Sequence, residues 1–198
     1  DHTLCKMTSL FQLFGMVMSC GLMACASTFV SIWIGKKYVI AAPVVFICCI
    51  NIYLTIVKDP LWQAMDACGL FAYDRNLAII STAINLVISV VLGLKLGMLG
   101  IFIGTAVSTI FEVIFKSSGI YHKRLLLPGK KYGLLWIRMA VSELTALVLS
   151  CLISEITCGN LYLDFLVHGC LAVAGVGIVY GILFPQNLSG IRKKIIRR

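Results

Sequence analysis

Charged residues are scarce in this sequence: Asp, Glu, Lys and Arg together make up only 13% of its 198 residues. A soluble domain keeps roughly a quarter of its residues charged. Hydrophobic residues instead make up 60% of the chain. This balance excludes an ordinary water-soluble fold and favours a protein embedded in a membrane.

Several long runs have no charged residue at all, and an apolar run of about 18 or more residues is typical of a membrane-spanning helix. Strict alternation of apolar and polar residues is also missing, so the runs are not predicted to be barrel strands. We therefore predict an all-α polytopic membrane protein, a bundle of six transmembrane helices that forms one domain over 1–198. The predicted spans are 7–34, 39–57 with an extension to about 68, 77–94, 98–115, 133–154 and 161–184.

Catalytic and metal-binding motifs are missing as well. No CxxC pair occurs among the nine cysteines, and the three histidines do not cluster with them. A thiol inside an apolar run packs as a small hydrophobic group, so we expect reduced packing residues at these positions. They are Cys20, Cys25, Cys48, Cys49, Cys151 and Cys170. No phosphate loop, HExxH or GxSxG motif is present, so we predict that the chain is not an enzyme and uses no metal or cofactor.

Acidic residues are rarer than basic ones, at 8 against 17, and the formal net charge is +9. Six spans put both termini on one side of the membrane, and the opposite side then carries only Lys36, Lys37 and Lys95. Because Lys and Arg concentrate on the cytoplasmic side, both termini are predicted to be cytoplasmic. Basic residues placed in this way lie beside anionic headgroups, so we expect membrane lipid as their partner and no nucleic acid.

Two backbone features organise the middle of the chain. Pro60 removes one helical hydrogen bond, which predicts a kink, and apolar spacing beyond it predicts that the second helix continues to Gly69. We expect a loop at 73–76 and a polar connector at 116–131. A very short turn at 95–100 is expected to join two antiparallel spans whose small residues permit close contact.

Lys58, Asp59 and Asp66 stand out because they adjoin an apolar run. Asp59 and Asp66 are seven residues apart and therefore share one helical face. In one reading, Lys58 extends into the cytoplasmic headgroups with Asp59 beside it. In the other, all three side chains line a cavity open to the cytoplasm. The sequence leaves both readings open.

Polar residues also occur within the predicted spans. Glu143 lies near mid-membrane, where an unpaired carboxylate costs several kcal/mol, so we expect it to be protonated or paired with another span. A structural pair and a coupling-ion site both remain open for it. Glu112 is expected to face Arg138 at the membrane interface. His168 is predicted to be a hydrogen-bonded core histidine, with a proton relay as the alternative. Asn85 is expected to bond across helices.

Five segments in order resemble the C-terminal half of the polysaccharide-biosynthesis flippases, the O-antigen and capsule repeat-unit exporters of the MATE-like superfamily. The segments are SIWIGKKYV at 31–39, QAMDACGLFAYDR at 63–75 after a KDP kink, INLVISVVL at 84–92, GMLGIFIGTAVS at 97–108 and FKSSGIYHKRL at 115–125. The first, fifth and sixth spans fit that family by hydropathy alone.

The resemblance implies one lobe of a two-lobed transporter in the inner (plasma) membrane of a bacterium, with the N-terminal six-helix lobe lying outside this sequence. The sequence begins at Asp1 without Met, so we expect either a fragment or a half that pairs with another polypeptide. The family implies translocation of undecaprenyl-diphosphate-linked oligosaccharide.

The resemblance also implies which residues contact the substrate. Lys58, where the family usually has arginine, and then Arg75 are expected to hold the diphosphate. Asp59, Asp66 and Asn85 complete the expected substrate site. Alternatively, Asp74 and Arg75 in the expected loop form a cytoplasmic gate or a simple ion pair.

Two other functions stay open. A drug or cation antiporter lobe of the same superfamily requires an essential, ion-linked Glu143 or Asp66. A non-transporting assembly subunit predicts that Lys58→Ala and Asp66→Ala leave function intact. An integral-membrane transferase ranks behind both because a catalytic cluster is missing.

Overall fold

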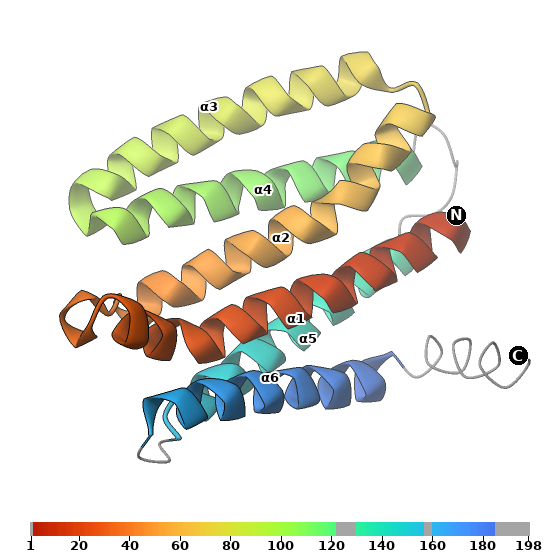
Figure 1. Cartoon of the computed structure of the whole chain (residues 1–198). Coiled ribbons are helices and arrows are strands. Elements are labelled where there is room, and N and C mark those ends of the chain that lie inside the picture. The colour runs from red at the N-terminus through yellow and green to blue at the C-terminus, as the bar shows by residue number, and fades with distance from the viewer. Residues whose placement is uncertain (1, 122–129, 157–159, 185–198) are drawn as a thin grey trace, which may run out of the picture. The chain divides into compact units, whose positions relative to one another are not determined.

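The computed structural model describes residues 2–121, 130–156 and 160–184, and these residues form helices and no strands. The elements are α1 (His2–Trp33), the short 3-10 helix η1 (Lys36–Tyr38), α2 (Ala42–Ala67), α3 (Phe71–Leu96), α4 (Met98–Ile120), α5 (Lys130–Ile153) and α6 (Leu161–Leu183) (Figure 1). Within the described residues, six helices are long and apolar enough to cross a membrane. The predicted all-helical, multi-pass fold is confirmed.

The chain divides into two compact units. The first unit contains α2, α3 and α4 together with α1 up to Gly15. The second contains α1 from Met16 onward, η1, α6 and α5 from Leu135 onward. The assignment of all six helices to a single lobe stays a prediction.

The second helix continues through its internal proline, as predicted. Pro60 lies inside α2, which changes direction in its C-terminal part (Figure 1). Gly69 has a φ of 67° and ends the helical path, a conformation that glycine adopts without strain. The predicted loop at 73–76 is wrong, because α3 already begins at Phe71. Asp74 stands in the first turn of α3, where a carboxylate is favourable beside the helix N-terminus.

A single residue joins α3 to α4, so the turn is even tighter than predicted. Gly97 has a φ of 64°, and its N–H donates to the Gly93 carbonyl at 2.9 Å. The two helices then run side by side (Figure 1). Gly100 and Gly104 are buried at this contact, against the backbone of Leu92 and the residue Ser89. The predicted close approach of small residues is confirmed.

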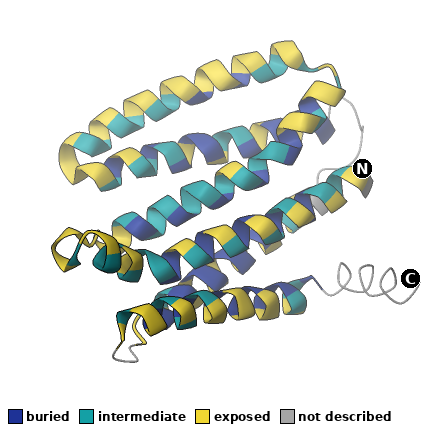
Figure 2. Ribbon diagram, viewed as in Figure 1, coloured by how far each residue is buried: buried dark blue, intermediate teal, exposed yellow. Residues whose placement is uncertain are grey.

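Much of α3 is exposed (Figure 2), and its exposed residues include many large hydrophobic ones. Ile79, Leu86 and Leu94 are all exposed, and Leu94 is 86% exposed. Only Leu77 and Ser81 of this helix are buried. A surface of this composition suits contact with hydrocarbon rather than water.

The cysteines of the described residues are free thiols. Cys20 and Cys49 are fully buried, whereas Cys170 is exposed. No group of three or more His, Cys, Asp or Glu side chains able to hold a metal ion occurs in the part of the chain that the structure describes.

Candidate functional site

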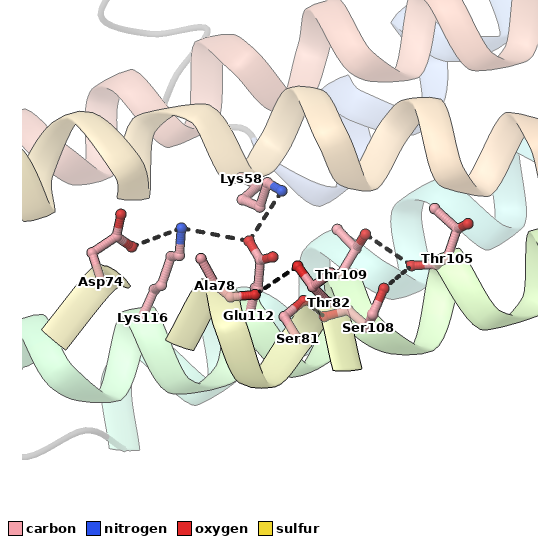
Figure 3. A network of polar contacts seen from close by, with 10 residues as sticks. All are labelled: Lys58, Asp74, Ala78, Ser81, Thr82, Thr105, Ser108, Thr109, Glu112 and Lys116. Carbon is pink, nitrogen blue, oxygen red and sulfur yellow. Dashed lines mark hydrogen bonds and ion pairs between the residues drawn. The ribbon is translucent and has the colours of Figure 1, made fainter. Parts of the chain in front are cut away.

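Four charged side chains from three helices of the first unit form one network (Figure 3). Lys58 comes from α2, Asp74 from the first turn of α3, and both Glu112 and Lys116 from α4. Lys58 lies nine residues before the end of α2, which is about 13 Å along the helix axis. The network therefore lies within the apolar helices, toward the end of the unit that carries the α2–α3 turn.

Glu112 is the bridging member of this network. Its Oε2 atom lies 3.0 Å from Lys58 Nζ and 3.4 Å from Lys116 Nζ. The Lys116 ammonium also lies 2.8 Å from Asp74 Oδ1. Glu112 and Lys116 are one helical turn apart, the spacing at which side chains of a helix meet. The four side chains thus form a chain of alternating charge that connects three helices.

The charges of the network balance, because two ammonium groups face two carboxylates. The Lys116 side chain is 6% exposed and the Lys58 side chain is 25% exposed. Lys58 is therefore the easier of the two cations for a ligand to reach. Taking Lys116 away would leave Asp74 without its ion-pair partner in a site with little water, which is strongly destabilising. The arrangement holds α2, α3 and α4 together and leaves Lys58 as the more accessible cation.

Hydroxyl groups continue the polar surface along α3 and α4 (Figure 3). Ser81 Oγ on α3 donates to the Ser108 carbonyl on α4 at 3.3 Å. On α4, the Thr105 carbonyl accepts hydrogen bonds from Ser108 Oγ and Thr109 Oγ1, each at 2.9 Å. These hydroxyl groups add no charge, and Ser81 also hydrogen-bonds to Glu112 of the network.

The other predicted substrate residues of this region lie apart from the network. Asp59 is half-buried, while Asp66 and Arg75 are exposed. None of the three forms an ion pair with another described residue. Arg75 follows Asp74 directly in the first turn of α3, so it belongs to the same end of the unit. Their assignment to a substrate site stays a prediction.

The expected cross-helix bond of Asn85 is wrong. Its Oδ1 accepts a 2.7 Å hydrogen bond from Ser89 Oγ one turn further along α3. The amide that does connect two helices is Asn51, whose Nδ2 donates to the Phe102 carbonyl on α4 at 3.0 Å. Ser89 bonds the Asn85 side chain within α3 because the two residues are four positions apart, the spacing at which side chains of a helix meet.

Glu112 and Arg138, which were expected to face each other, each have other partners within their own units. Glu112 is occupied by Lys58 and Lys116. Arg138 instead donates a short hydrogen bond to the Leu183 carbonyl at the end of α6, and its guanidinium lies 5.1 Å from the centre of the Phe184 ring. A basic side chain at this position satisfies a terminal carbonyl that has no helical partner.

Lys116 and Asp74 are functional candidates that the sequence analysis placed elsewhere. Lys116 was expected in the polar connector, but α4 extends to Ile120 and Lys116 is buried within it. Asp74 was expected in a loop that is instead the first turn of α3. The signal was present in both cases. Glu112 and Lys116 have the four-residue spacing of an intrahelical ion pair, and an aspartate suits the start of a helix.

In the second unit, two predicted polar residues have partners. Glu143 is 3% exposed, and its Oε1 lies 2.7 Å from Ser19 Oγ on α1, so the expected partner from another span is present. His168 is 2% exposed; its Nε2 lies 2.7 Å from the Ile156 carbonyl and its Nδ1 3.4 Å from Thr28 Oγ1. His168 is therefore a buried, hydrogen-bonded histidine, as predicted.

Part of the predicted topology falls outside the described residues. The connector residues at 122–129 and the basic C-terminal sequence at 185–198 belong to this part, so the cytoplasmic assignment of the termini stays a prediction. Comparison of the chain with protein-family models, curated proteins and solved structures found no match.

Proposed function

We propose that this chain is one lobe of a membrane flippase for lipid-linked oligosaccharides, and that Lys58 meets the diphosphate of the substrate. The observation that carries the proposal is the shared carboxylate of Glu112, which pairs with two lysines of unequal exposure. Charged side chains inside transmembrane segments are rare and costly, so they are candidates for a substrate or ion pathway.

Lys58 is the exchangeable cation of the network. If Lys58 leaves Glu112, the carboxylate keeps its contact with Lys116, and Lys116 keeps Asp74. The three remaining side chains therefore stay paired. A diphosphate has more negative charge and more acceptor oxygens than a carboxylate, so it competes well for an ammonium group. The network thus releases one cation to an anionic headgroup without leaving a buried charge alone.

Three other predicted residues of the first unit suit the rest of such a substrate. Asp59 is half-buried, and Asp66 and Arg75 are exposed, so their side chains are open to further contacts. Carboxylates accept hydrogen bonds from sugar hydroxyls, and a guanidinium binds phosphate in a bidentate manner. In this proposal, Arg75 supports Lys58 at the diphosphate, while Asp59 and Asp66 contact the sugars. Asn85, bonded to Ser89, contributes polarity rather than a direct contact.

The proposal includes the position of the chain in the cell. Excess Lys and Arg on the side of the termini supports cytoplasmic termini, and the resemblance to flippases implies the inner membrane of a bacterium. On that orientation, the α2–α3 turn and the network lie toward the cytoplasmic leaflet, where a lipid-linked precursor is made. The resemblance to flippases implies a partner lobe of six helices outside this sequence.

A binding measurement tests the role of Lys58. The chain in lipid nanodiscs is expected to bind undecaprenyl diphosphate more tightly than undecaprenol, which has the same tail and no diphosphate. Lys58→Gln is expected to weaken the diphosphate ligand by about 10- to 100-fold, the equivalent of one charge-assisted hydrogen bond. Microscale thermophoresis on the purified chain measures both affinities.

Lys95→Gln is the matched control, because Lys95 is an exposed lysine in the last turn of α3. It is expected to bind undecaprenyl diphosphate like the unmodified chain. Equal affinities for undecaprenyl diphosphate and undecaprenol, or an equal loss in the two variants, would refute a specific site at Lys58.

A cation or drug antiporter lobe is the second candidate, and the buried carboxyl group of Glu143 favours it. An antiporter requires the Glu143 carboxyl group to bind the coupling cation and to release it when the substrate binds. The two functions separate in proteoliposomes, because an antiporter dissipates a cation gradient when a cationic drug is added. A flippase lobe does not respond to the drug.

A further inference from the structure

The second unit contains a buried carboxyl group with an unusual hydrogen-bond arrangement. Glu143 on α5 is 3% exposed and Ser19 on α1 is fully buried. Ser19 Oγ lies 2.7 Å from Glu143 Oε1 and 3.2 Å from the Met16 carbonyl oxygen. One hydroxyl group therefore faces two oxygen atoms at hydrogen-bond distance.

Counting protons distinguishes the two charge states of Glu143. A serine hydroxyl has one proton and can donate only once. If Glu143 is ionised, Ser19 donates either to the carboxylate or to the Met16 carbonyl, and one contact has no proton. If Glu143 is a neutral acid, it donates from Oε1 to Ser19 Oγ, and Ser19 donates to Met16. The neutral state alone supplies a proton to both contacts.

The second carboxyl oxygen of Glu143 also favours the neutral acid. Glu143 Oε2 is buried and has no hydrogen-bond partner among the described residues. As part of a carboxylate, that oxygen would carry half of an uncompensated charge, whereas the carbonyl oxygen of a neutral acid costs much less to bury. The ion pairs of the described residues do not include Glu143.

Among the residues that the structure describes, no cation is paired with Glu143. Cys20, next to Ser19 on α1, interacts electrostatically with Glu143 and is hydrogen-bonded to Ser19 and Ser150, and a thiol carries no positive charge. Arg138 lies five residues earlier on α5, where its guanidinium is engaged with the Leu183 carbonyl and the Phe184 ring. On α6, His168 is bonded to Ile156 and Thr28.

We infer that Glu143 and Ser19 form a proton-binding site, in which Glu143 holds an exchangeable proton and Ser19 relays its hydrogen bond to the Met16 carbonyl. The ligand is a proton rather than a metal cation, because a metal cation requires several oxygen ligands around it. When the proton leaves, Ser19 turns its donor toward the carboxylate. The inference concerns the second unit and does not depend on the diphosphate site at Lys58.

Infrared difference spectroscopy of the chain in nanodiscs at neutral pH tests this inference. The spectrum of the unmodified chain minus that of Glu143→Gln is expected to contain the C=O stretching band of a protonated carboxylic acid. Transfer to heavy water is expected to shift the band, because the proton exchanges. Ser19→Ala is expected to move it to higher frequency, because the hydrogen bond from the acid is lost.

Glu143→Gln is nearly isosteric and neutral, so its thermal unfolding is expected to match that of the unmodified chain. This comparison keeps a folding defect separate from the loss of the band. A carboxylate band in place of the acid band would overturn the inference, and so would an acid band that heavy water leaves unshifted. Neither result bears on the affinity for undecaprenyl diphosphate.

Discussion

Replacing Lys116 with methionine is expected to lower the free energy of unfolding by about 3–5 kcal/mol, the usual effect of removing one partner from a buried ion pair. Lys116 is 4% exposed and contacts the carboxylates of Asp74 and Glu112. Methionine has a similar length, so the substitution removes the charge and little volume. Asp74 would then face a poorly hydrated site alone. Unfolding of the chain in bicelles, followed by circular dichroism, measures the change.

Two comparisons separate lost charge from lost packing. Lys95→Met removes an exposed lysine that has no ion pair among the described residues, and is expected to change the free energy of unfolding by less than about 0.5 kcal/mol. Adding Asp74→Asn to Lys116→Met is expected to restore part of the stability. A loss below about 1 kcal/mol for Lys116→Met would mean that the network is not a structural link between the three helices.

Replacing Gly100 with alanine is expected to destabilise the α3–α4 hairpin by about 3 kcal/mol, the upper part of the range for added atoms in a tight contact. An added Cβ at this position would lie 2.2 Å from the Leu92 carbonyl oxygen and 2.3 Å from its carbon. Both are backbone atoms of the adjacent helix, so no side-chain rotation relieves the clash. The helices must move apart, but the single-residue turn at Gly97 restricts this movement. The same bicelle unfolding experiment applies.

Gly21→Ala is the matched control for Gly100→Ala. Gly21 also lies inside a helix, and an added Cβ there meets no atom within 4 Å. Because alanine has a higher helix propensity than glycine, this variant is expected to be as stable as the unmodified chain or slightly more stable. Equal stability of the two alanine variants would contradict the close packing of α3 on α4.

The helices themselves follow from the sequence because long apolar runs have few alternatives in a membrane. Even the passage of α2 through Pro60 was predictable, since apolar spacing continues on both sides of it. Helix ends were less predictable. The sequence analysis took charged residues such as Lys116 and Asp74 as marks of a connector or a loop, whereas both lie inside helices.

The pairing of these charges could not be predicted for a physical reason. Charges that neutralise one another remain inside a helix bundle at lower cost than single charges, so a charge need not end a span. Which charges meet depends on how three helices converge, and Lys58, Asp74 and Glu112 lie on three different helices. Only the contact of Glu112 with Lys116 could be predicted from the sequence, because the two residues are four positions apart on one helix. The role of Glu112 as a shared carboxylate appears only in the folded chain.

In the proposed site, Glu112 competes with an anionic headgroup for Lys58. The most direct measurement is the affinity of Glu112→Gln for undecaprenyl diphosphate in nanodiscs, with Glu112→Gln/Lys58→Gln as the paired variant. Glutamine frees Lys58 while Lys116 stays paired with Asp74. We expect tighter binding than in the unmodified chain, and loss of that gain when Lys58 is also replaced. Unchanged or weaker binding by a folded Glu112→Gln chain would contradict it.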